Sequence, residues 1–149
     1  MDYSPILAPV VALVAWTLLI MLWMAVARRK AFAAMGVTFG NIPPGSRGAN
    51  LDGKAPDECQ WPSHNYNHLM EQPTIFYAIA LTTALMGMGG GINCWLAWGY
   101  VGFRVVHSLV QCTVNVVAIR FPLFLLASLC LMGMTLNAGL QLLRDCGLI

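Results

Sequence analysis

The sequence predicts an all-α fold, an integral membrane four-helix bundle protomer, and two observations carry that prediction. The chain of 149 residues is 58% apolar and only 9% charged, with a mean hydropathy of +0.69, whereas a soluble domain carries about 25% charged residues. A membrane-spanning helix takes about 20 mostly apolar residues, so four spans leave room for short connections and one longer loop. We therefore expect a single membrane domain over residues 1–149.

The first span is expected at about 6–27, an uncharged apolar run that ends at Arg28-Arg29-Lys30. A cleavable signal peptide carries its positive charges before its apolar stretch, whereas here they follow it. Because cytoplasmic loops are enriched in Lys and Arg, these cations place the long loop 28–63 in the cytoplasm and the N-terminus outside.

The other three spans are expected at about 64–88, 93–119 and 122–143. Ser63 is a candidate N-cap for the second span. The run Gly89-Gly90-Gly91 predicts a tight turn to the third span, and Arg120-Phe121-Pro122 predicts its end because proline ends or kinks a helix. With four spans, both termini lie outside and Arg120 lies on the cytoplasmic side.

Polar side chains recur within the second and third spans. The group in the second span is His64, His68 and Glu71. The group in the third span is Arg104, His107, Gln111 and Asn115. At helical periodicity the first group falls within an arc of about 60° and the second within about 80°. Because ionisable side chains inside spans are costly and mark candidate functional sites, two facing groups predict a polar cavity or a buried network.

The charged residues of these groups, and Arg120 after them, each have a structural and a functional interpretation. Glu71 and Arg104 either pair as a buried ion pair, since buried charges need partners, or bound a ligand site. Arg120 would fall about 160° from Arg104 on a continuous third helix. It either extends to the lipid headgroups or stabilises a thiolate, and on that face it would complete a site between subunits.

Metal and nucleic-acid chemistry are not expected. The spacing of His64, His68 and Glu71 puts three ligand types on one helix face, but an iron enzyme built on histidine boxes needs more than the three histidines of this chain. The five cysteines are scattered without a C-x-x-C pair and predict neither a disulfide framework nor a zinc site. No basic stripe indicates nucleic-acid binding.

Three stretches of the sequence resemble the MAPEG family, the membrane-associated proteins in eicosanoid and glutathione metabolism, in the pattern of its microsomal glutathione transferases and prostaglandin E synthase. They are Arg28-Arg29-Lys30-Ala31-Phe32-Ala33, His68-Leu69-Met70-Glu71, and Arg104-Val105-Val106-His107-Ser108 with the later Arg120. The length, the four-span layout and the long first loop agree with this resemblance.

The resemblance implies a homotrimer of four-helix protomers, with glutathione between neighbouring subunits and a lipophilic small molecule entering from the membrane lipid. It implies that Glu71 faces the amino end of glutathione, that Arg104 and His107 line or brace the pocket, and that Arg120 is the catalytic, thiolate-stabilising arginine. The expected cofactor-binding set is completed by His64, His68, Gln111 and Asn115.

The chain also departs from the family pattern. Glutathione-using members have an arginine and an asparagine where this chain has His64 and His68, a tyrosine at Gln111 and often an arginine at Val116. The expected function is therefore a glutathione-dependent transferase or peroxidase acting on lipophilic electrophiles, or a non-catalytic lipid-binding, scaffold or accessory protein with the same fold. A third interpretation is a small proton-coupled exporter that uses Glu71.

Overall fold

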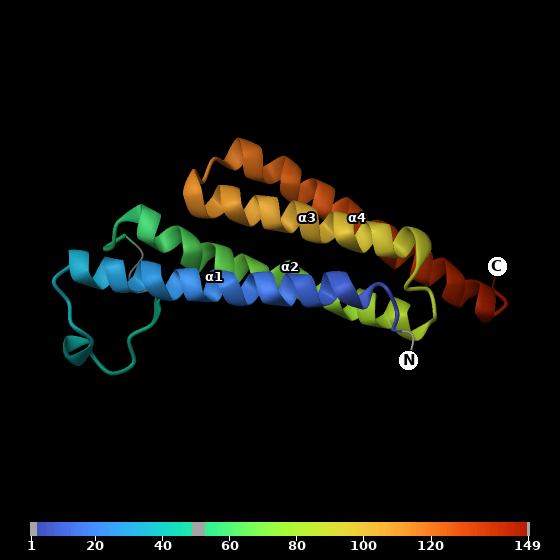
Figure 1. Cartoon of the computed structure of the whole chain (residues 1–149), viewed down its shortest axis with the longest axis horizontal. Helices are drawn as coiled ribbons and strands as arrows, with labels where there is room; N and C mark the ends of the chain where they lie inside the picture. Colours follow the sequence, from blue (N-terminus) through green and yellow to red (C-terminus); the bar gives the residue numbers. More distant parts are fainter. Residues whose placement is uncertain (1–2, 49–52, 149) are drawn as a thin grey trace.

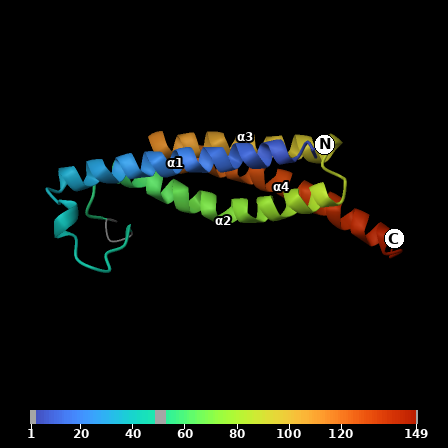
Figure 2. The ribbon, with the colours of Figure 1, turned by 60° about the horizontal axis from the view of Figure 1, so that its bottom comes forward.

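The structure, a computed structural model, describes residues 3–48 and 53–148. Over these residues the chain is all-α, without strands, which confirms the predicted class. The helices are α1 (Leu7–Ala34), the short 3-10 helix η1 (Phe39–Asn41), α2 (Asp57–Leu85), α3 (Gly91–Thr113) and α4 (Val117–Asp145). The most extensive interfaces join α3 to α4 and α1 to α2, and Figures 1 and 2 show these two pairs lying along one another.

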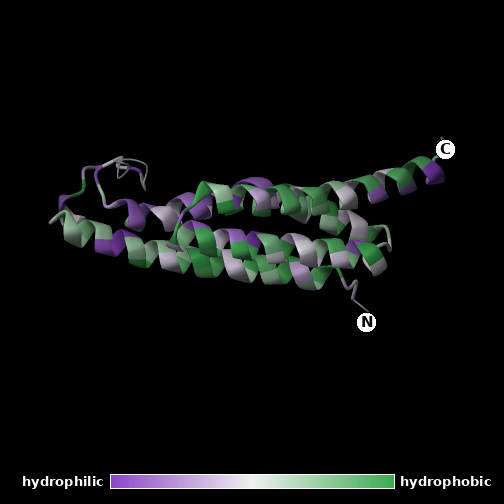
Figure 3. Ribbon diagram, turned by 90° about the horizontal axis from the view of Figure 1, so that it is seen from above, coloured by the Kyte–Doolittle hydropathy of each residue, from purple (hydrophilic) through white to green (hydrophobic). Residues whose placement is uncertain are grey.

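Two helices of the described part, α1 and α4, are long and apolar enough to cross a membrane, with mean hydropathies of 2.5 and 2.0 over their most apolar windows. Figure 3 shows hydrophobic residues along most of both helices. Large apolar side chains on them remain exposed, including Leu22 and Leu136 at 59% and 61%. Exposed apolar surface of this kind is stable in lipid and costly in water. That all four helices span the membrane stays a prediction.

The first two helices extend further into the expected loop than predicted. The α1 helix continues through the three cations to Ala34, because Arg, Lys and Ala are good helix formers. The α2 helix begins at Asp57, with Pro56 at the N-cap position, so the prediction of Ser63 as the N-cap is wrong. Ser63 instead accepts a hydrogen bond from Arg28 Nη2 at 3.0 Å, which joins α2 to the end of α1.

The turn between α3 and α4 comes earlier than predicted. The α3 helix ends at Thr113, and Asn115 has a left-handed backbone with φ of 53°. Asparagine tolerates this conformation, which commonly ends helices. Asn115 and Arg120 therefore do not lie on the third helix, and Pro122 lies inside α4, where it removes only one backbone donor from the helix.

Asn115 should make a small but measurable contribution to stability. Asn115→Ala is expected to lower the free energy of unfolding by about 1 kcal/mol, because a β-carbon without a compensating polar group is strained at positive φ. Asn115→Gly is the matched control and should keep or slightly raise stability. The measurement is unfolding in SDS followed by circular dichroism, and equal losses in both variants would contradict the backbone explanation.

Polar and aromatic contacts fix how the helix pairs meet. Phe76 of α2 stacks on Tyr100 of α3 with ring centroids 4.4 Å apart. Gln72 Nε2 of α2 donates to Ser128 Oγ of α4 at 2.8 Å. Hydrogen bonds between helices help to specify packing where apolar surface alone does not, so these contacts hold α2 in register with the hairpin of α3 and α4.

Candidate functional site

An open groove lies where α2, α3 and the first turns of α4 meet, with a volume of about 240 Å³. Its lining residues are His68, His107, Val117, Arg120, Phe121 and Phe124. Each of the three helices therefore contributes one sequence-predicted polar side chain: His68, His107 and Arg120. The prediction that Arg120 faces away from the polar group of the third helix is wrong, because the turn at Asn115 ends that helix before Arg120.

The polar side chains of the groove are close together but leave hydrogen-bonding capacity unused. The rings of His68 and His107 lie 5.5 Å apart, and Phe124 meets His68 edge-on at 6.0 Å. Within residues 3–48 and 53–148, His68 Nδ1 and Arg120 Nε are buried with no hydrogen-bond partner. Because buried polar groups in proteins almost always have a partner, these two atoms mark where a ligand or ordered water would bind.

Arg104 does not line the groove but binds the backbone of His68, one of the residues that does. Its side chain is only 1% exposed, and its Nη2 donates to the backbone oxygen of His68 at 2.6 Å. Its Nε and Nη1 are buried and find no partner in the described residues, while Glu71 is exposed on α2. The expected ion pair between Glu71 and Arg104 is therefore not formed, and Arg104 braces the turn of α2 that carries His68.

Pro73 interrupts the backbone hydrogen-bond ladder of α2 one carbonyl beyond the oxygen that Arg104 contacts. Pro73 lies inside α2 and has no backbone N–H, so the carbonyl of Leu69 loses its helical donor. Arg104 donates to the neighbouring carbonyl, that of His68. The proline therefore disturbs the backbone hydrogen-bond ladder of α2 beside the groove, and Arg104 crosses from α3 to this point.

Two further polar side chains lie among these helices and were not predicted. Asn65 and Ser108 are fully buried, and Ser108 Oγ has no partner in the described part of the chain. Ser108 follows Arg104 by four residues and precedes Gln111 by three, so helical spacing alone could have placed it on the same face.

The remaining predicted residues do not line the groove. His64 and Glu71 are exposed on α2, Gln111 is buried at 3% exposure, and Asn115 lies in the turn after α3. Gln111 Oε1 and Asn115 Oδ1 are buried without a partner in the described residues. No group of three or more metal-binding side chains occurs within these same residues.

Phe121 and Phe124 add an apolar surface that was not predicted. Phe124 follows Arg120 by four residues on α4, which places both on one side of the helix. The groove thus combines one guanidinium and two imidazoles with Val117 and two phenyl rings. Such a combination suits a ligand with an anionic part and a lipophilic part.

Comparison with known proteins gives one finding. The family model described as the MAPEG family matches residues 6–140 of the chain. No curated protein and no solved structure matched the chain.

Proposed function

This chain belongs to the MAPEG family, and from that premise we propose that it is a glutathione-dependent transferase or peroxidase acting on lipophilic electrophiles. Membership supports a membrane protein of a family broadly associated with glutathione. The observation that carries the finer proposal is that Arg120 meets His68 and His107 in a groove that also exposes apolar side chains.

In this proposal Arg120 stabilises the anionic group of the ligand, and the two phenylalanines bind its lipophilic part. Arg120 places a permanent positive charge beside the position that the thiolate sulfur would occupy. A charge held in place in this way stabilises the thiolate and the negative charge that develops during the reaction. Phe121 and Phe124 hold the lipophilic partner against the same wall. Glutathione would release its thiol proton to solvent, and its sulfur would form a bond to the electrophilic carbon while a leaving group departs with the electron pair of the bond that breaks.

The polar atoms of the groove fit the anionic groups of glutathione. Arg120 Nε is an unpartnered donor, and His68 Nδ1 donates when it carries the proton. The volume of about 240 Å³ is below the 300–1,000 Å³ or so of pockets that enclose a small molecule. We therefore propose that a second copy completes the site in a homotrimer, with the exposed Glu71 of α2 facing the neighbouring protomer.

The membrane arrangement belongs to the same proposal. The four helices would each span the lipid, with the loop 28–63 in the cytoplasm and both termini outside. The cations at the end of α1 and Arg120 at the start of α4 support this orientation, since positive charges are retained on the cytoplasmic side.

Thiolate formation on the purified protein tests the proposal directly. Mixing glutathione with the full-length protein in detergent should give the ultraviolet absorbance of a thiolate at neutral pH, because Arg120 favours the ionised sulfur. A generic lipophilic electrophile should then be conjugated. Absence of both signals in a folded, oligomeric preparation would exclude the enzyme.

The second candidate is a non-catalytic lipid-binding or accessory protein with the same fold. It is favoured by the apolar half of the groove and by Gln111 and Val116, which stand where glutathione-using members have a tyrosine and an arginine. Lipid or a partner protein that co-purifies stoichiometrically, together with no thiolate signal, would support this candidate over the enzyme.

A further inference from the structure

A larger cavity lies at the end of α1, with a volume of about 920 Å³. It is formed by the last turns of α1, by residues 35–48 that follow them and by Lys54. None of its lining residues lines the groove between α2, α3 and α4. Figure 1 shows the chain after α1 folding beside that end of the helix.

The polar part of this cavity is strongly positive. Four cations line it, Arg28 and Arg29 from α1 with Arg47 and Lys54 from the following segment, and none of the lining residues is acidic. Arg28 donates through Nη2 to Ser63, but its buried Nε has no partner among the described residues. Four like charges around one cavity repel one another, so an anion bound between them would relieve that repulsion.

The rest of the wall is apolar and continues onto the surface of α1. Met21, Leu22 and Ala25 line the cavity one to two turns before the arginines. Leu18 and Leu22 on the same helix are 52% and 59% exposed. Because α1 is long and apolar enough to cross a membrane, this wall is suited to a hydrocarbon chain that extends from the cavity along the helix.

We propose that this cavity binds one anionic phospholipid molecule, with its phosphate among Arg28, Arg29, Arg47 and Lys54 and an acyl chain along Met21 and Leu22. Cations that directly follow an apolar helix lie at the depth of the lipid headgroups, where anionic lipids attract them. Free phosphate would use the cations but leave the apolar wall uncovered, which is why the lipid is the occupant. The proposal does not depend on thiol chemistry.

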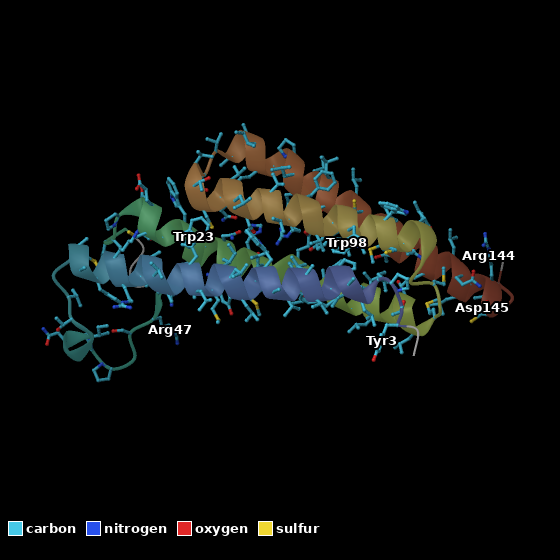
Figure 4. All side chains as sticks on the ribbon, viewed as in Figure 1. Tyr3, Trp23, Arg47, Trp98, Arg144 and Asp145 are labelled. Atoms are coloured by element: carbon cyan, nitrogen blue, oxygen red, sulfur yellow. The ribbon has the colours of Figure 1, made fainter. Side chains whose placement is uncertain are left out.

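The expected preference is measurable because each cation contributes about fivefold to binding of an anionic headgroup. The Arg47→Gln/Lys54→Gln double variant should therefore lose about 25-fold in affinity, and Arg47→Gln alone about fivefold. Arg144→Gln is the matched control, because Figure 4 shows Arg144 at the end of the molecule opposite Arg47.

Native mass spectrometry of the full-length protein tests the proposal with equimolar phosphatidylglycerol and phosphatidylcholine of identical acyl chains. The wild type and Arg144→Gln should retain phosphatidylglycerol preferentially, and in the double variant this preference should fall by about 25-fold, leaving only the part due to Arg28 and Arg29. If the double variant fails to fold, the fivefold loss in Arg47→Gln carries the test. Equal retention of both lipids, an unchanged preference in the variants, or full displacement by inorganic phosphate would overturn the proposal.

Discussion

Arg120→Gln is expected to lower kcat/KM for conjugation of a lipophilic electrophile by about 100- to 1,000-fold, the loss seen when one preorganised charge-stabilising group is removed. Glutamine keeps much of the length of the side chain but removes the charge that faces His68 and His107 in the groove. The thiolate absorbance should fall with the activity, because both depend on the same guanidinium. Steady-state kinetics and absorbance titration on one preparation measure the two effects together.

Two comparison variants separate the charge of Arg120 from its packing. Arg120→Lys should recover part of the thiolate signal, since it restores the charge without the planar donor geometry of arginine. Arg144→Gln removes an exposed cation at the far end of α4 and should leave kcat/KM unchanged. Full activity in Arg120→Gln would refute the role of this residue, even if the protein proved to be a transferase.

Arg104→Ala is expected to lower the free energy of unfolding by about 2–4 kcal/mol, because it leaves a cavity in the bundle and removes a charged hydrogen bond. Arg104 is nearly fully buried and joins α3 to the His68 carbonyl of α2 at 2.6 Å. The measurement is an SDS unfolding titration followed by circular dichroism. Loss of the brace should also loosen His68, so KM for glutathione should rise.

Arg104→Met distinguishes packing from charge. Methionine refills most of the space and removes a buried guanidinium whose Nε and Nη1 lack partners within the described residues. Replacing a buried charge with an apolar side chain of similar volume is often nearly neutral, so the loss should stay below about 1.5 kcal/mol. A loss as large as that of Arg104→Ala would show that the charge itself is needed, as it would be if a ligand or a second copy supplied its partner.

The polar residues illustrate which parts of a site can be predicted from sequence. His68, His107 and Arg120 were predicted as candidates because ionisable groups are rare in so apolar a chain, and the structure brings these three to one groove. Whether Glu71 pairs with Arg104 stayed open at the level of sequence, because helical spacing gives the face of a side chain but not the orientation of one helix against another. Asn65 and Phe124 were not predicted, because neither lies on the helix faces that the ionisable residues of the second and third spans define.

The sequence by itself determined that this protein is an all-α membrane protein, because its 58% apolar residues with 9% charge are gathered in runs as long as membrane-spanning helices. The family followed from three short stretches, and the match over residues 6–140 confirmed it. Only the tertiary structure decided where Arg120 points. Asn115, which has a left-handed backbone, follows the end of α3 and comes before Pro122, the residue that the sequence predicted as the end of the third span. That shift in the turn moves Arg120 from the far face of one helix to the near face of the next, beside His107, because side-chain direction depends on where each helix begins.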